Sequence, residues 1–203
     1  MVKYIFSAIV GYLAGSLSPS ALISRVKQKN IRECGTKNLG ATNVTLIFGK
    51  KLGALVMAFD IAKAFVPFKI MQGLFPSSVG IGMVAGAAAV LGHVFPCYHG
   101  FRGGKGLASF GGLVLAYDTR IFIFLCLTGI VLMLIVNYSF ILPFYASLAF
   151  PIFVARREAS VLIFLLALAV SALIFVKHYS NMVKAKNGED KTIREYIKKI
   201  INN

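Results

Sequence analysis

Apolar residues occur along this chain in long runs that are separated by short polar segments. The runs predict helices at about 4–24, 52–74, 79–97, 107–117, 120–136, 139–155 and 160–177. A helix needs about 20 apolar residues to cross a bilayer, and the fourth to sixth runs are short by that measure. The first run is interrupted at 15–19 (Gly-Ser-Leu-Ser-Pro), which predicts a break or kink. The pattern predicts an all-α polytopic membrane protein with seven transmembrane helices in a single domain, 1–203.

Composition supports a membrane protein, because 58% of the residues are hydrophobic, 14% are charged and the mean hydropathy is +0.78. A soluble domain of 203 residues could not bury this much apolar surface. In a soluble chain, the net charge of +15 would indicate nucleic acid. Here the basic residues lie between apolar runs, so lipid headgroups and a phosphorylated substrate account for them, and no nucleic-acid partner is expected.

The basic residues also predict the topology. Sixteen lie on one side of a seven-crossing protein, in the loops 25–51 and 98–106 and the tail 178–203 with Lys177, against four on the other side. The positive-inside rule places that side in the cytoplasm, so the N-terminus lies outside and the C-terminus inside. The pair Arg156 and Arg157 falls on the outer side, against the rule.

The loop 92–106 carries a first candidate phosphate site. Gly103, Gly104 and Gly106 would let backbone N–H groups approach one anion, and Lys105 adds a charge, with Arg102 and His93 close in sequence. A P-loop is excluded, because its first glycine position is occupied by a histidine and its hydroxyl position by a glycine. The alternative is that the glycines let helices pack and the lysine reaches lipid headgroups.

A second polar loop lies upstream, at 35–43. It offers hydroxyl, carboxamide and ammonium groups that suit phosphate and polyol oxygens. Its candidate residues are Gly35, Thr36, Lys37, Asn38, Gly40, Thr42 and Asn43. The alternative is an ordinary capped turn that leads into a helix.

Two further polar pairs lie within or beside apolar runs. Asp60 and Lys63 share a helix face, which predicts a structural ion pair facing the bundle interior. His178 and Asn181 are one helical turn apart, just past the last predicted helix. The three cysteines match no metal or disulfide spacing, so neither a metal nor a cofactor is expected.

Several motifs in this order resemble one family. They are Gly-Ser at 15–16, Gly-x-x-Asn-x-Gly-Ala-Thr-Asn at 35–43, the Asp60 and Lys63 pair, Gly-His-x-Phe-Pro at 92–96, Phe-x-Gly-Gly-Lys-Gly at 101–106, and His-x-x-Asn at 178–181. Together they are similar to the PlsY family, the bacterial acyl-phosphate-dependent glycerol-3-phosphate acyltransferases. The resemblance implies a seven-helix enzyme of the bacterial cytoplasmic (inner) membrane whose partners are the bilayer, acyl phosphate and glycerol 3-phosphate. It would transfer the acyl chain to the 1-hydroxyl and release lysophosphatidic acid and phosphate, and we expect a monomer.

On this resemblance we assign catalysis to Lys105, His178, Asn38 and Thr36. Substrate binding would fall to Gly35, Lys37, Gly40, Thr42, Asn43, His93, Arg102, Gly103, Gly104, Gly106, Asn181 and Ser16. Lys105 would hold the donor phosphate, and Asn43, Arg102, His178 and Asn181 would orient the acceptor. An acyl phosphate is an activated mixed anhydride, so positioning and charge stabilisation suffice without a nucleophilic residue.

Some positions depart from the family's pattern. Thr36 and Lys37 stand where the family has Ser-Gly, Asn30 replaces an acid, Leu46 replaces a basic residue, and Phe140 and Pro143 replace serines. Lys37 could supply the charge missing at Leu46. Two alternatives therefore stay open: a weakened or inactive paralogue, and a transporter of a phosphorylated metabolite.

Overall fold

The computed structural model describes residues 1–189, 192–195 and 198, and its regular elements there are all helical. They are α1 (Val2–Ser16), α2 (Pro19–Val26), α3 (Ala41–Phe48), α4 (Lys50–Leu74), α5 (Ile81–Val94), a 3-10 turn (Cys97–His99), α6 (Leu107–Tyr117), α7 (Thr119–Val136), α8 (Ile141–Arg157) and α9 (Val161–Lys186). The all-α prediction is confirmed. The rest of the predicted tail, 190–191, 196–197 and 199–203, lies outside the described residues.

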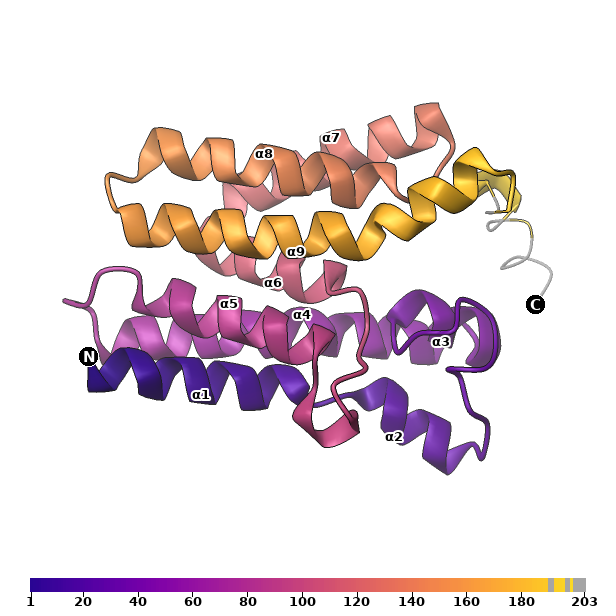
Figure 1. Cartoon of the computed structure of the whole chain (residues 1–203), viewed down its shortest axis with the longest axis horizontal. Coiled ribbons are helices and arrows are strands. Elements are labelled where there is room, and N and C mark those ends of the chain that lie inside the picture. Colours follow the sequence, from indigo (N-terminus) through magenta and orange to yellow (C-terminus); the bar gives the residue numbers. More distant parts are fainter. Residues whose placement is uncertain (190–191, 196–197, 199–203) are drawn as a thin grey trace.

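The long helices lie side by side and alternate in direction (Figure 1). In that view α7, α8 and α9 form one layer, α1, α4 and α5 the opposite layer, and α6 lies between them. The chain turns at 75–80, 118 and 158–160 at the end that carries the N-terminus. At the other end lie α2, α3 and the loop 95–106, so the two predicted polar loops share one end of the bundle.

Small residues let α1 and α5 approach closely. A Cβ on Gly11 would overlap the carbonyl of Ala85, and a Cβ on Gly15 would overlap that of Ala89. Interfaces of this kind are typical of membrane helices, where close backbone packing replaces the hydrophobic driving force. The contact places the end of α1 beside the end of α5.

The predicted break in the first helix is confirmed at Leu17, whose backbone is extended. The chain resumes as a helix at Pro19, a residue suited to the first helical position, and the Ser18 hydroxyl accepts a hydrogen bond from Ala21 N–H at 3.3 Å. The break leaves the carbonyl end of α1 inside the protein.

Four segments in the described part of the chain are long and apolar enough to cross a membrane: Val2–Val26, Ile81–His99, Thr119–Val136 and Val161–Lys186. The remaining long helices differ for identifiable reasons. α4 contains Asp60, Lys63 and Lys69 among its apolar residues, α6 has 11 residues and α8 has 17. The structure therefore supports a helical membrane protein, and the seven crossings stay a prediction.

The helices differ from the prediction in two ways that bear on the candidate site. α9 does not end at 177 but continues to Lys186, because Lys, Ala and Met residues there favour a helix, and Gly188 in the left-handed region follows its end. His178 and Asn181 thus lie within α9. The polar segment 25–51 also contains a helix that the pattern missed, α3, since its eight residues are too few for a clear period.

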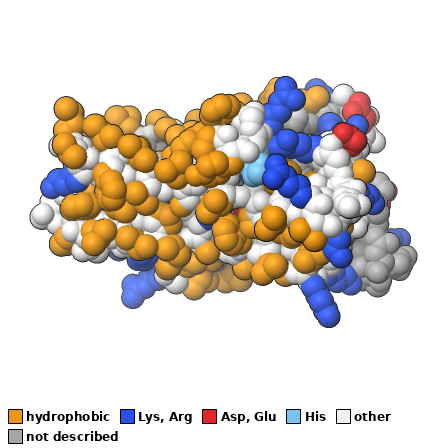
Figure 2. Space-filling model, turned by 90° about the horizontal axis from the view of Figure 1, so that it is seen from below, with side chains coloured by type: hydrophobic (Ala, Val, Ile, Leu, Met, Phe, Trp, Pro, Cys, Tyr) orange, Lys and Arg blue, Asp and Glu red, His pale blue; other side chains and the backbone are white. Residues whose placement is uncertain are grey.

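Charge is distributed unevenly between the two ends. Lys and Arg side chains gather toward the end with α2 and α3, while apolar side chains cover most of the bundle (Figure 2). At the opposite end Arg157 forms an ion pair with Asp118, and Tyr117 donates to Glu158 at 3.0 Å. The exception to the positive-inside pattern at Arg157 is therefore balanced by an acid beside it.

Candidate functional site

Segments far apart in the sequence meet beside the break between α1 and α2. A small recess there is lined by residues 15–18 of the break, Leu39 of the upstream loop, Lys63, His93, Pro96, Gly103 and Gly104. The structure thus brings together four predicted site residues that the sequence spreads over about ninety positions: Ser16, His93, Gly103 and Gly104.

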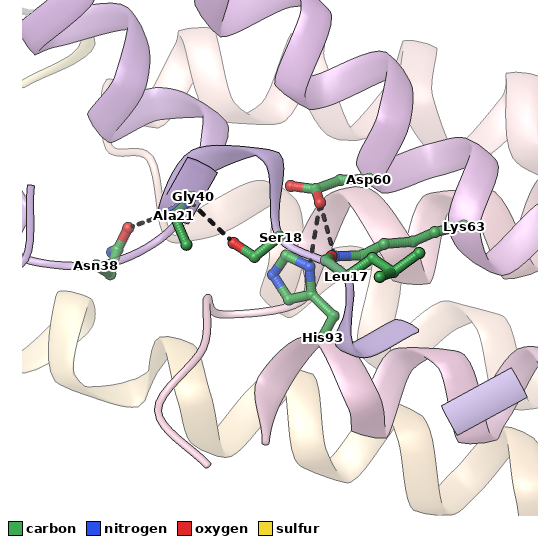
Figure 3. A network of polar contacts seen from close by, with 8 residues as sticks. All are labelled: Leu17, Ser18, Ala21, Asn38, Gly40, Asp60, Lys63 and His93. Atoms are coloured by element: carbon green, nitrogen blue, oxygen red, sulfur yellow. Dashed lines mark hydrogen bonds and ion pairs between the residues drawn. The ribbon is translucent and has the colours of Figure 1, made fainter. Parts of the chain in front are cut away.

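A buried ionic cluster forms the inner wall of the recess (Figure 3). Lys63 Nζ lies 2.8 Å from Asp60 Oδ1, and His93 Nδ1 lies 3.4 Å from the same oxygen. The side chains of all three are at most 5% exposed. The predicted Asp60–Lys63 ion pair is confirmed, and the structure places the His93 ring beside the same carboxylate.

Lys63 also stabilises the break itself. Its Nζ donates to the carbonyl of Leu17 at 2.9 Å (Figure 3). Carbonyls at a helix C-terminus have no intrahelical donor and carry partial negative charge, so a buried ammonium group suits them. The sequence indicated Asp60 and Lys63 as an internal pair, but it gave no signal that Lys63 would reach α1.

Two glycines of the downstream loop hold it against the end of α5. Gly103 N–H donates to the Val94 carbonyl at 3.1 Å and Gly104 N–H to the His93 carbonyl at 3.2 Å. Our expectation that these two amides point at a ligand therefore does not hold, because they satisfy the end of α5. A Cβ on Gly103 would overlap the His93 carbonyl, and one on Gly104 would overlap the His93 ring.

Gly106 and the start of α6 keep the capacity to hold an anion. Gly106 has φ +87 and precedes α6, which begins at Leu107. The first-turn N–H groups of a helix lack intrahelical acceptors and favour a negative charge. A Cβ on Gly106 would crowd Ile174 of α9, so this helix start lies close to α9.

Lys105 links the downstream loop to α9, where its Nζ donates to Asn181 Oδ1. His178 lies one turn earlier on the same helix. His178 is 7% exposed, and neither of its ring nitrogens has a hydrogen-bond partner among the described residues. A buried imidazole of this kind is available to a ligand, since buried polar groups are otherwise paired.

In the upstream loop Asn43 is the centre of the hydrogen bonding. It is fully buried, its Nδ2 donates to the carbonyls of Ile31 at 2.7 Å and Asn38 at 2.9 Å, and its Oδ1 accepts from Thr36 N–H at 2.8 Å. Asn38 in turn accepts from Gly40 N–H at 3.0 Å, and Gly40 precedes α3. Asn43 therefore holds the loop together, a role that its predicted contact with substrate did not include.

Other residues of this loop remain available. The Thr36 hydroxyl oxygen is buried and lacks a partner within the described structure, so it could donate to a ligand. Lys37 and Thr42 are exposed. Gly35 and Lys37 have φ of +58 and +56, a region that suits the glycine but is unfavourable for the lysine.

Arg32 joins the segment between α2 and the upstream loop to the downstream loop, and it was not predicted as a site residue. Its guanidinium donates to the carbonyls of His99 at 3.2 Å and Arg102 at 2.6 Å. The exposed Arg102 thus contributes its backbone to the loop contact. Ser16, predicted to bind substrate, donates to Tyr12 O at 2.8 Å and accepts from Cys97 N–H, so its hydroxyl ties α1 to the 3-10 turn.

A comparison with known proteins finds a family model described as glycerol-3-phosphate acyltransferase, which matches residues 5–188. A glycerol-3-phosphate acyltransferase of Aquifex aeolicus (strain VF5) is 32% identical over 189 residues, covering 93% of this chain and 98% of the relative. One of Wolbachia pipientis wMel is 34% identical over 193 residues, covering 94% and 97%.

Solved structures give the same match. The crystal structure of PlsY (YgiH), an integral membrane glycerol 3-phosphate acyltransferase, in its glycerol 3-phosphate form has a TM-score of 0.87 and 32% identity, over 94% of this chain and 95% of that one. The lysophosphatidic acid form has a TM-score of 0.84 and 31% identity, over 93% and 94%.

Proposed function

The chain belongs to the glycerol-3-phosphate acyltransferase family, and we propose that the end of its bundle where Lys105 contacts Asn181, one helical turn from His178, is the catalytic centre. The protein transfers an acyl group to glycerol 3-phosphate and gives lysophosphatidic acid. The two similar solved structures are of forms with glycerol 3-phosphate and lysophosphatidic acid, the acceptor and the product of one such transfer. The observation that supports the site is the buried His178, whose ring nitrogens have no hydrogen-bond partner among the described residues, one helical turn from the Asn181 that binds Lys105.

The donor in this proposal is an acyl phosphate. The 1-hydroxyl oxygen of glycerol 3-phosphate attacks the acyl carbonyl carbon and forms the ester bond. The bond from that carbon to the phosphate oxygen breaks, and inorganic phosphate leaves with the electron pair. Because phosphate is a good leaving group, the step needs orientation and charge stabilisation rather than a covalent intermediate on the protein.

The residues around Lys105 suit these needs. The Lys105 ammonium group and the first-turn amides of α6 would stabilise the charge on the donor phosphate. Asn181 would hold Lys105 in position through its side-chain oxygen. His178 would take the hydroxyl proton as the bond forms, since a neutral imidazole can serve as a general base.

One observation supports the alternative that the protein is a weakened paralogue. Phe140 stacks on Tyr138 and packs edge-on against Phe144, and Pro143 is buried in α8. Where the resemblance expects serine hydroxyls, this chain therefore has an aromatic cluster and a residue without a hydrogen-bond donor.

The test uses the purified protein in lipid nanodiscs with glycerol 3-phosphate and, separately, acyl phosphate, acyl-CoA and acyl-carrier-protein donors. We expect lysophosphatidic acid from acyl phosphate and little from the thioesters. Formation from a thioester alone would reject the donor assignment, and no product with any donor would identify an inactive paralogue.

We further propose seven crossings of a bacterial inner membrane, with the N-terminus outside, and a protein that acts as a monomer. The alternating helix directions and the gathering of basic residues at one end support the topology, and the origin of all proposed site residues in one chain supports the monomer. In a variant without native cysteines, a cysteine at Ser77 should react with an impermeant maleimide added outside the cell. A cysteine at Lys27 should not, and its labelling from outside would reject this orientation.

A further inference from the structure

A second and larger cavity, with a volume of about 410 Å³, opens beside α2. It is lined by Ala21, Ser24, Arg25, Gln28, Lys29, Asn30, Arg32, Leu39 and His99, and we call it the α2 groove. Leu39 lines both the α2 groove and the recess at the helix break. The groove is therefore adjacent to the recess, whose lining includes Gly104, the residue before Lys105.

The floor of the α2 groove is held in place by its own hydrogen bonds. The Ser24 hydroxyl donates to the Lys29 carbonyl at 2.6 Å and accepts from Ile31 N–H at 3.4 Å, which closes the turn after α2. Arg32 N–H donates to Asn30 Oδ1 at 3.1 Å, and the Arg32 guanidinium bonds the loop that contains His99. These contacts fix the backbone of the turn and the guanidinium of Arg32, while Arg25 and Lys29 extend exposed side chains along the groove.

The lining is polar and positive. Arg25, Lys29 and Arg32 contribute three cations, and no acidic residue is among the nine that line the groove. The nearby acid Glu33 accepts a hydrogen bond from Asn30 Nδ2. A concave surface lined by one sign of charge raises the local concentration of oppositely charged ligands. Ala21 and Leu39 are its two apolar residues, so the lining suits a small water-soluble anion better than an acyl chain.

We propose that the α2 groove is an entry site that captures the phosphate of glycerol 3-phosphate from water before the acceptor reaches the catalytic centre. The inference rests on the proposed function, since it assigns a path to the acceptor of that reaction. The three cations bind the phosphate dianion, and the polar side chains of Ser24, Gln28 and Asn30 face the hydroxyl groups. The acyl donor, which carries the apolar chain, reaches the site from the bilayer instead.

The test compares two charge-removing variants in zwitterionic phosphatidylcholine nanodiscs. Arg25→Ala with Lys29→Ala should raise KM for glycerol 3-phosphate about three- to tenfold, the sum expected for two exposed charges, with kcat and KM for the donor unchanged. Lys27→Ala with Lys51→Ala removes the same charge from exposed positions outside the groove and should leave KM within about twofold. Arg25→Lys with Lys29→Arg should restore the wild-type KM.

Equal KM values in the two alanine variants would overturn the entry site, as would a fall in kcat without a change in KM. A lipid headgroup is the other source of phosphate. If the effect of Arg25→Ala with Lys29→Ala appears in phosphatidylglycerol nanodiscs but not in phosphatidylcholine, the groove binds anionic lipid and the proposal is wrong.

Calorimetry separates this inference from the proposed function. Glycerol 3-phosphate titrated into the protein without donor should bind more weakly to Arg25→Ala with Lys29→Ala than to the Lys27 and Lys51 variant. If the wild type forms no lysophosphatidic acid, the proposed function fails, while this difference in binding still supports the groove. Equal binding by the two variants rejects the groove even where the wild type is active.

Discussion

The two glycine-rich loops contain similar residues but are held in place in different ways. In the upstream loop, 35–43, the hydrogen bonds are local, because Asn43 binds groups no more than 12 residues away. In the downstream loop, Gly103 and Gly104 bind the end of α5, and Lys105 reaches α9, 76 residues along the chain. One loop is shaped by its own residues and the other by the helices around it.

This difference distinguishes a loop whose polar groups stabilise its own structure from a loop that carries a proposed catalytic group. Asn43, the most buried polar side chain of the upstream loop, makes hydrogen bonds only to nearby backbone groups. In the downstream loop, the charged Lys105 contacts Asn181 on α9, one helical turn from the buried His178. Loops with similar glycine, amide and lysine residues can therefore either stabilise the fold or contribute to the candidate site. We expect substitutions in the upstream loop to reduce stability first and those around Lys105 to reduce turnover first.

The largest expected effect is that of Lys105→Ala. Removing a preorganised positive charge from the phosphate should lower kcat/KM at least about a hundredfold. The melting temperature in detergent should fall less than it does for Asn43→Ala. Steady-state formation of lysophosphatidic acid and a thermal melt measure the two effects.

Lys184→Ala is the matched control, since Lys184 is an exposed lysine further along α9. It should retain wild-type kinetics. If Lys105→Ala instead kept near-normal turnover and KM, Lys105 would lie outside the catalytic centre and the comparison of the loops would fail.

The next effect is that of Asn43→Ala, which should destabilise the protein by about 2–3 kcal/mol because two carbonyls and one amide lose a buried partner. For a chain of this length, that corresponds to a melting temperature lower by about 5–10 °C. Asn187→Ala, at an exposed asparagine after α9, should change stability by less than about 0.5 kcal/mol. An unchanged melting temperature with lost turnover would show that Asn43 serves substrate rather than the loop.

The smallest effect concerns Lys37, which has a left-handed backbone and an exposed side chain. Lys37→Gly should raise stability by about 1 kcal/mol, because glycine adopts this conformation without the steric cost of a Cβ. The same variant should lower activity several-fold if Lys37 supplies the cation absent at Leu46. The melting temperature and kcat/KM of one purified variant report both effects.

A double-mutant cycle sharpens that test. Leu46→Arg should restore the activity of Lys37→Gly if the two positions provide the same charge to the site. Leu46 lies in α3, directly after the loop. Strictly additive effects of the two substitutions would contradict compensation and favour the weakened paralogue.

The sequence predicted features that depend on neighbours in the chain. Runs of apolar residues gave the long helices, residues 15–19 gave the break, and the three-residue spacing of Asp60 and Lys63 gave the ion pair. The unequal distribution of basic residues placed both polar loops at one end, as Figure 1 shows. Hydropathy and spacing are sufficient here because helix periodicity fixes which residues share a face.

Only the tertiary structure determined which polar groups from distant segments form hydrogen bonds with one another. Nothing near Lys63 in sequence indicates the Leu17 carbonyl, and nothing near Arg32 indicates the carbonyls of His99 and Arg102. The tertiary contacts also turned the Gly103 and Gly104 amides toward α5 and brought Lys105 to Asn181, one helical turn from the buried His178. A hydrogen bond forms only when donor and acceptor lie within about 3 Å of each other. Between distant segments that distance is set by how the helices pack, which the local sequence does not determine.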